Sequence, residues 1–415
     1  MNDQWLVLVE SNTTGSGRLF CASARRLGLR PVLLARDPAR YPYLATDDID
    51  AVAVDTASVA AVCAAAGRLG GRVAGVTSSS EYFIGTASEA ARTLGRPHPD
   101  PDAVRACRNK HIQRLRLAAA GVPGPAFAAA GTPAAAVRAA ERIGYPVVVK
   151  PVAGSGSIGT RLCGSAAEVH EAAAGVLAAD PAAIGLPPQE AVMVEAKLDG
   201  AEFSVETLDD QVIGVIGKRL GPEPYFVEIG HDFPAPVDRA ARAALERTAI
   251  DALRALGLGW GAAHVELRHT EAAGARLIEV NPRLAGGMIP RMIEESRGVD
   301  MIFHMVAKAA GRARSPRPTR SRAAAIRFLV APHAGQLVEI AGVAAARRVP
   351  GVVEVGLTCR PGQELVLGHS FRDRLGYVIA AAEAGNVAAR AADDGLRALE
   401  ARIAPASVVA EGSPH

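Results

Sequence analysis

The stretch that decides the fold runs from His264 to Arg283 and reads HVELRHTEAAGARLIEVNPR. Strand-forming residues lie on both sides of a short turn, and their alternation with polar residues predicts a β-hairpin. We centre this hairpin between Ala272 and Ala273. The pairs that then face each other are Glu266 with Glu279 and His264 with Asn281.

Two carboxylates directly opposite each other on a sheet repel, so the pairing of Glu266 with Glu279 predicts a cation between them. Magnesium prefers one or two carboxylates together with substrate phosphates, which indicates a nucleotide site. Arg283 follows Pro282, and its planar guanidinium suits a carboxylate or a phosphoryl group. The alternative is a solvated hairpin face with ordinary Glu and Arg residues, but the rest of the sequence favours the metal.

The composition is that of a globular protein with two or three domains. The chain has 415 residues, of which 49% are hydrophobic and 21% are charged. The net charge is +3 and the basic residues are scattered, which argues against a nucleic-acid partner. No apolar run approaches the ~20 residues of a membrane span, and the N-terminus shows no secretory signal. We therefore expect a cytoplasmic protein without a membrane partner.

The first part of the chain, up to about residue 108, alternates short apolar strands with helical segments. This order predicts parallel βαβ units in an open sheet. A helix is expected from Asn109 to Ala120, with Lys110 in its first turn and Gly and Pro residues at its end. Lysine is rare in this arginine-rich chain, so a retained lysine indicates a need for a compact ammonium group.

A glycine-rich loop follows the buried strand that ends at Lys150. Its residues from Gly154 to Gly159 match the pattern Gly-x-Gly-x-x-Gly, which by itself predicts a nicotinamide or flavin cofactor. The context argues against that cofactor, because Thr160 to Cys163 continues as a strand and no acidic residue follows at the ribose-binding position. A nicotinamide oxidoreductase is thus an alternative that rests on this loop alone.

Glu266, taken together with Glu279-Val-Asn281-Pro-Arg283, resembles the magnesium-binding end of the ATP-grasp ligases, and the resemblance extends over nearly the whole chain. It implies that Glu266, Glu279 and Asn281 hold the metal ions that bridge the ATP phosphates. It also implies that Arg283 binds the transferred phosphoryl group or the acyl phosphate. The implied cofactors are ATP, as a co-substrate, and two magnesium ions, which manganese can replace.

The same resemblance assigns further residues to ATP. The two lysines would contact its phosphates, and the glycine-rich loop would be the flexible flap that closes on them. The segment from Glu195 to Lys197 would bind adenine through its main chain, and Glu202 would hold the ribose hydroxyls. The implied ATP-binding residues are Lys110, Lys150, Gly154, Ser155, Gly156, Ser157, Glu195, Ala196, Lys197 and Glu202.

Two other segments resemble the L-amino-acid ligases of this superfamily. One is the Gly-His followed by Pro between residues 230 and 234, and the other is the Asn-Pro-Arg-Leu-Ala-Gly-Gly run that ends at Gly287. The implied catalytic residues are Arg283, His231 and Lys218, and the implied substrate contacts are Arg283, Gly286, Gly287 and Glu228.

The implied fold is α/β, with α+β character in the nucleotide part: an ATP-grasp fold with an N-terminal open parallel Rossmann-like sheet, a two-part ATP-grasp core and a small C-terminal lid domain. We expect the chain to end in a helix from about Asn386 to Ile403. The expected domains are 1–108 (N-terminal), 109–311 (ATP-grasp, with a flap at about 122–195), 312–322 (linker), 323–405 (lid) and 406–415 (loose tail).

We therefore expect an ATP-dependent carboxylate-amine ligase that forms an amide or peptide bond through an acyl phosphate and releases ADP and phosphate. Its partners would be small carboxylate and amine substrates, such as an L-amino acid, and a homodimer is common among relatives. The alternative within the superfamily is a bicarbonate-activating biotin-carboxylase-like or purine-pathway enzyme. A catalytically inactive nucleotide-binding module is disfavoured, because Glu266, Glu279 and Asn281 are all present.

Overall fold

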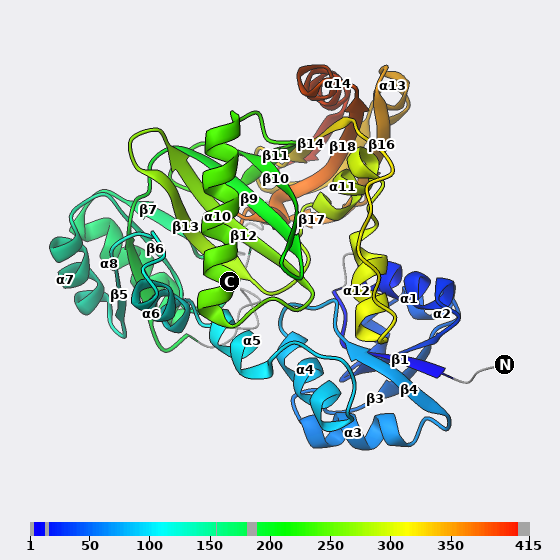
Figure 1. The fold of residues 1–415 in the computed structure, drawn as a ribbon. Coiled ribbons are helices and arrows are strands. Elements are labelled where there is room, and N and C mark those ends of the chain that lie inside the picture. The colour runs from blue at the N-terminus through cyan, green and yellow to red at the C-terminus, as the bar shows by residue number, and fades with distance from the viewer. Residues whose placement is uncertain (1–3, 13–15, 155, 181–188, 406–415) are drawn as a thin grey trace, which may run out of the picture. The chain divides into compact units, whose positions relative to one another are not determined.

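The computed structural model describes residues 4–12, 16–154, 156–180 and 189–405 (Figure 1). The chain folds into two compact units, each built from segments that are far apart in the sequence. The first unit consists of Met1–Gly124, Phe203–Val215 and Val237–Arg320, and the second consists of Pro125–Glu202, Ile216–Pro236 and Ser321–His415. No helix within these described ranges is both long and apolar enough to cross a membrane.

The N-terminal part of the first unit is the expected open parallel sheet. Its strands are arranged in the order β3-β2-β1-β4 and all pair in parallel. The strands are β1 (Gln4–Val9), β2 (Arg30–Ala35), β3 (Asp50–Ala53) and β4 (Arg72–Thr77), and the helices between and after them are α1 (Ser16–Arg26), η1 (Pro38–Arg40), α2 (Tyr43–Thr46), α3 (Val59–Gly67) and α4 (Ile84–Thr93). The prediction of parallel βαβ units is confirmed.

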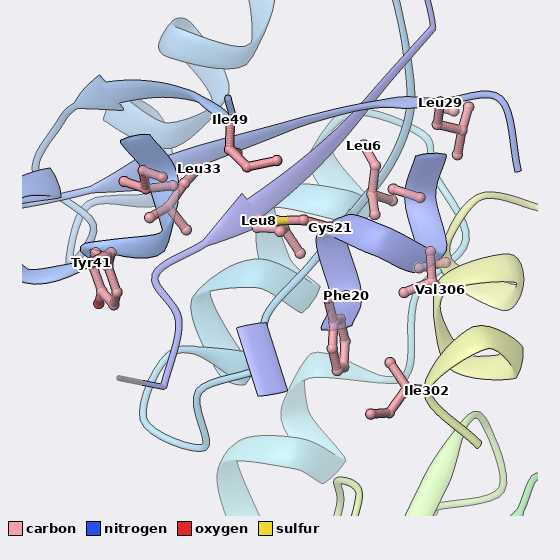
Figure 2. Packing of buried hydrophobic residues seen from close by; sticks show 14 of the residues in the cluster. Leu6, Leu8, Phe20, Cys21, Leu29, Leu33, Tyr41, Ile49, Ile302 and Val306 are labelled. Atoms are coloured by element: carbon pink, nitrogen blue, oxygen red, sulfur yellow. The ribbon is translucent and has the colours of Figure 1, made fainter. Parts of the chain in front are cut away.

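A helix from much later in the chain completes the core of this sheet. In Figure 2, Leu6, Leu8 and Phe20 lie with Ile302 and Val306, which belong to α12 (Met301–Ala309). The helix approaches the sheet closely at Gly75, where an added Cβ would lie 2.1 Å from the carbonyl oxygen of Ala309. Residues about 300 positions apart therefore share one apolar core.

The rest of the first unit carries the hairpin predicted within residues 264–283. The strands of this hairpin are β12 (Ala262–Thr270) and β13 (Gly274–Asn281), and β9 (Ala201–Leu208) follows β12 in the strand order. The helices are α5 (Pro101–Arg108), α6 (Lys110–Ala119), α10 (Arg239–Leu256) and α11 (Ile289–Arg297). Local sequence sets the helix ends: Asn109 caps α6, Asp238 caps α10, and Gly257 ends α10 in the left-handed conformation at φ 69°.

The second unit begins with a four-stranded sheet in the order β5-β8-β6-β7. Its elements are β5 (Phe127–Ala130), α7 (Pro133–Ile143), β6 (Val147–Pro151), β7 (Arg161–Cys163), α8 (Ala166–Ala178) and β8 (Val192–Ala196). The two helices and the sheet share one apolar core. Because β6 and β7 pair as antiparallel neighbours, the glycine-rich loop joins two strands and not a strand to a helix. This connection contradicts the dinucleotide-binding interpretation of the loop.

The remaining strands of the second unit form two further antiparallel arrays, in the orders β10-β11-β14-β18-β16 and β17-β15-β19. Strands β9 and β10 contribute residues to both units. The elements are β10 (Gln211–Leu220), β11 (Glu228–Phe233), β14 (Ala323–Val330), β15 (Gly335–Ala341), α13 (Val343–Arg348), β16 (Val352–Leu357), β17 (Glu364–Leu365), η2 (Phe371–Asp373), β18 (Arg374–Ala382), α14 (Gly385–Arg397) and β19 (Glu400–Ala404).

The expected terminal helix is wrong over its last six residues, 398–403. Helix α14 ends at Arg397, and the following residues form β19, which pairs with β15 through Leu337 and Ile403. Strand β15 was not expected from the sequence. Its pairing and the apolar cluster around Leu337 outweigh the local helix preference of residues 398–403. The loose tail expected at 406–415 lies outside the described residues.

Candidate active site

The hairpin brings together the residue pairs expected from the sequence. Glu266 pairs with Glu279, and His264 pairs with Asn281. The assumed turn centre is wrong, however, because Thr270 pairs with Gly274 and Leu267 with Leu277. A β-bulge places the additional residue Ile278 in β13 and shifts the register back at the functional end of the hairpin.

Three of the predicted ATP and metal residues lie together in the first unit. The side-chain amide of Asn281 donates to Glu279 Oε1 at 2.9 Å, and Lys110 Nζ lies 3.3 Å from Glu279 Oε2. Lys110 occupies the first turn of α6, as expected. This cluster combines one cation with oxygen donors that suit a hard metal ion and a phosphate.

The second carboxylate of the hairpin, Glu266, is held by a buried histidine. His264 contacts Glu206 Oε1 through Nδ1 at 2.7 Å and Glu266 Oε1 through Nε2 at 2.8 Å. Burial alone would lower the pKa of His264, but Glu206 and Glu266 raise it to about 9. An imidazolium that donates from both ring nitrogens therefore fixes the orientation of Glu266. Glu206, which lies on β9, was not identified from the sequence.

Arg283 is held by residues that the sequence analysis did not identify. Its Nε donates to Glu81 Oε2 at 2.7 Å, and Arg108 Nη1 lies 3.0 Å from Glu81 Oε1. Burial opposes ionisation of Glu81, but the guanidinium groups of Arg283 and Arg108 keep its pKa below the ordinary value. Beyond Arg283, an added Cβ at Gly286 would meet nothing within 4 Å, while Gly287 is left-handed at φ 57°.

In the second unit, Lys150 and Glu195 form a buried ion pair between the adjacent strands β6 and β8. Lys150 Nζ lies 2.8 Å from Glu195 Oε2, and the two side chains are 6% and 5% exposed. The main-chain N–H groups of Ala196 and Lys197 donate to the carbonyls of Ala126 and Pro146. The expected adenine contacts of this segment would therefore depend on groups other than these two N–H donors.

The glycine-rich loop is positioned by contacts within the second unit. Ser157 Oγ donates to the carbonyl of Phe226 at 3.2 Å. Gly156 lies against Phe371, since an added Cβ at Gly156 would be 2.4 Å from that ring. Gly154 is described with φ 146°, whereas Ser155 lies outside the described residues. The structure thus describes the predicted loop from Gly154 to Gly159 except at residue 155.

Four further predicted residues gather on β9, β10 and β11 of the second unit. Lys218 Nζ lies 2.7 Å from Glu228 Oε1 and 3.5 Å from Glu202 Oε1, and its side chain is 1% exposed. His231 Nε2 is 3.7 Å from Glu228 Oε2. Arg374 on β18 was not identified from the sequence, and its Nη2 donates to Glu228 Oε2 at 2.9 Å.

Glu228 is the carboxylate that this cluster surrounds. Burial would favour its neutral form, but Lys218, His231 and Arg374 hold the pKa of Glu228 well below its ordinary value. The guanidinium of Arg374 also lies 3.9 Å from the centre of the Phe328 ring. Glu228 is therefore an ionised anchor for Lys218 and Arg374, with His231 beside it.

The metal assignment can be tested against the donor set. Among the described residues, no three His, Cys, Asp or Glu side chains are grouped to hold a metal ion by themselves. Two facing carboxylates and one amide are nevertheless the incomplete oxygen set that magnesium takes when phosphates supply its other ligands. The hairpin fits a metal that binds with a nucleotide.

Two family models match the chain. Residues 143–291 match the ATP-grasp domain, and residues 327–404 match the L-amino acid ligase C-terminal domain 2. The chain belongs to the ATP-grasp family. Within that family it carries the C-terminal domain described for L-amino acid ligases. The resemblance inferred from the sequence is confirmed.

Individual proteins are similar to this chain in sequence or in fold. The chain is 39% identical to "Uncharacterized protein y4rH" of Sinorhizobium fredii, over 97% of this chain and 84% of that protein. It is 30% identical to human carnosine synthase 1 over 55% of this chain, but spans only 30% of that protein. The fold matches the crystal structure of an L-amino acid ligase from Bacillus licheniformis with a TM-score of 0.79 and 21% identity, over 97% of this chain and 100% of that one.

Proposed function

We propose that this protein joins a small carboxylate to an amine, with ATP and magnesium, and that an L-amino acid is one of its substrates. The observation that carries the proposal is the pairing of Glu266 with Glu279 beside Lys110 and Asn281, in a chain that carries an L-amino acid ligase C-terminal domain. That domain favours an amino-acid ligase over a bicarbonate-activating or purine-pathway enzyme.

The proposed reaction has two steps. An oxygen of the substrate carboxylate attacks the γ-phosphorus of ATP, the bond from that phosphorus to the bridging oxygen breaks, and ADP leaves. The amine then attacks the acyl carbon of the acyl phosphate, inorganic phosphate leaves, and the amine loses a proton. Magnesium, when bound, would neutralise charge on the phosphates.

The residues of the first unit would act on the reacting groups. Glu266, Glu279 and Asn281 would hold magnesium, and Lys110 would contact a phosphate oxygen. Arg283 would stabilise the charge that develops on the transferred group, and its ion pair with Glu81 would keep the guanidinium oriented. Manganese is expected to replace magnesium because it accepts the same oxygen ligands.

The residues of the second unit would act on ATP and on substrate binding. Lys150 would contact phosphates, and residues Gly154 to Ser157 would close over them. Glu202 would bind the ribose. Lys218, His231 and Glu228 form a cluster in which the substrate would meet the ammonium of Lys218, whose position Glu228 fixes.

The nucleotide product tests this proposal. A carboxylate substrate with ATP and magnesium should form an acyl phosphate that hydroxylamine traps as a hydroxamate, and chromatography should show ADP in equal amount. A screen of amino-acid pairs for phosphate release would identify the substrates. Stoichiometric AMP and pyrophosphate would refute the mechanism, because they would show attack at the α-phosphorus.

The expected cytoplasmic location and homodimer are part of the same proposal. Analytical ultracentrifugation of the full chain should give a sedimenting species of twice the 42.8 kDa chain mass. A concentration-independent monomer would contradict the dimer without affecting the proposed reaction.

A further inference from the structure

We propose that Gln113 and Arg114, two adjacent residues of α6, are positioning residues that hold Glu279 and Asn281 in the geometry needed for metal binding. The inference rests on the proposed function of the hairpin. Neither residue belongs to the metal, ATP or substrate sets assigned above, and both are buried, at 2% and 4% exposure.

Gln113 binds the one residue that separates the two expected metal ligands on β13. Its Nε2 donates to the carbonyl of Val280 at 2.8 Å, and its Oε1 accepts from the N–H of Val280 at 2.9 Å. A side-chain amide that both donates to and accepts from one residue acts like a neighbouring strand. Gln113 thereby fixes the backbone between Glu279 and Asn281.

Cys107 contacts both Gln113 and the carbonyl that Gln113 binds. Gln113 Nε2 also donates to the carbonyl of Cys107 at 2.7 Å, and Cys107 Sγ donates to the carbonyl of Val280 at 3.0 Å. Burial raises the pKa of Cys107 to about 12, so its thiol stays protonated and can act as this donor. The Val280 carbonyl therefore accepts from two side chains whose positions are coupled.

Arg114 binds the bulge that determines which face Glu279 occupies. Its Nη1 donates to the carbonyl of Leu277 at 3.0 Å, and its Nη2 donates to the carbonyl of Ile278. Ile278 is the additional residue of the bulge. Because side chains alternate along a strand, a shift of one residue would turn Glu279 away from Glu266. Arg114 thus stabilises the register that brings the two carboxylates together.

The same helix connects the backbone contacts to the charge at the site. Lys110, one turn before Arg114, lies 3.3 Å from Glu279 Oε2. In the loop that follows the helix, the carbonyl of Pro123 accepts from the N–H of Leu277 at 2.8 Å. Helix α6 therefore orients the carboxylate of Glu279, the peptide that follows Glu279, and the ammonium of Lys110 together.

Conservative substitutions separate this role from simple packing. Gln113→Glu keeps the side-chain shape but replaces the amide donor with an oxygen that would face the Val280 carbonyl. Arg114→Lys keeps the charge but offers one nitrogen where two carbonyls are bound. Gln113→Met serves as a second variant if the buried carboxylate prevents folding. Exposed Arg116 on the same helix supplies the matched control Arg116→Lys.

The experiment measures Mn²⁺ binding to the full chain in the presence of ADP, by the electron paramagnetic resonance of free Mn²⁺. Residues that orient metal ligands typically change metal affinity about 10- to 100-fold when substituted. We expect a weakening in this range for Gln113→Glu, Gln113→Met and Arg114→Lys, a higher KM for metal-ATP, and no change for Arg116→Lys. Val306 lies in the apolar core that the parallel sheet shares with α12. Val306→Ala should lower the melting temperature without changing Mn²⁺ affinity.

The outcomes distinguish this inference from the proposed function. If the Gln113 and Arg114 variants lose thermal stability like Val306→Ala but keep wild-type Mn²⁺ affinity, the two residues are only structural and the inference is overturned. If wild-type protein binds no Mn²⁺ with ADP, or if Glu279→Gln binds it normally, the proposed metal site itself is wrong.

Discussion

The ion pair between Lys150 and Glu195 allows a quantitative test of the second unit. The perturbation is Lys150→Met, which removes the ammonium but keeps an unbranched side chain. At the observed 2.8 Å, two unit charges attract by roughly 6 kcal/mol in an effective dielectric of about 20. The cost of desolvating both groups offsets much of that attraction, but removing one partner leaves the other charge buried. We expect the free energy of unfolding to fall by about 3–5 kcal/mol.

A double-mutant cycle isolates the interaction. Lys150→Met, Glu195→Gln and the double variant are compared by urea unfolding monitored by circular dichroism. The double variant should lose about 1–3 kcal/mol less than the sum of the single losses. The matched control is Arg402 with Glu339, a pair at 3.1 Å whose side chains are 59% and 47% exposed, where we expect a coupling of at most about 1 kcal/mol.

Additive losses for Lys150 and Glu195 would refute the electrostatic interpretation of this pair. Calorimetric titration with ATP then separates stability from function. Lys150→Met should weaken ATP binding by ~1–3 kcal/mol, the value of a charge-assisted contact, whereas Glu195→Gln should retain it. Unchanged ATP affinity in Lys150→Met would remove Lys150 from the proposed nucleotide site.

Three further predictions concern the charged side chains. Glu279→Gln should abolish ATP turnover while the melting temperature stays close to that of the wild type, because an amide cannot replace the anionic metal ligand; ADP release at the wild-type rate would contradict the metal assignment. Arg374→Gln should destabilise the protein by about 1–3 kcal/mol in urea unfolding, because Glu228 loses a charged donor. A loss below about 0.5 kcal/mol, the scale of a neutral surface change, would argue against this role of Arg374. Glu228→Gln tests the lowered pKa of that carboxyl: its stabilising contribution is fully present above the ordinary pKa of 4.5 and is lost as the pH falls through the folded-state pKa. The difference in melting temperature from the wild type should therefore be constant from neutral pH to about pH 5 and shrink below it; a constant difference down to pH 3 would be inconsistent with the shift.

Much of the fold could be predicted because local patterns carry it. Short apolar runs between helical segments identified the strands of the parallel sheet, and Gly and Pro residues marked the end of the helix that carries Lys110. The hairpin shows the limit of such reasoning. The pairs of Glu266 with Glu279 and of His264 with Asn281 are correct, but a bulge at Ile278 produces them around a turn that lies elsewhere than assumed. Alternation fixes which residues share a face, whereas Arg114 helps to fix the bulge.

Residue types and their spacing were enough to predict the chemistry of the candidate site: the carboxylates, the amide, the lysines and the arginine that suit a metal and a phosphate. Only the packing of distant elements shows which residues orient them. Glu206 binds His264, Glu81 binds Arg283, and Arg374 binds Glu228, each from a strand or loop more than 50 residues away. Spacing along a strand reports on neighbours within one element. The partners of a buried charge are set by how distant elements pack, and no local periodicity records that.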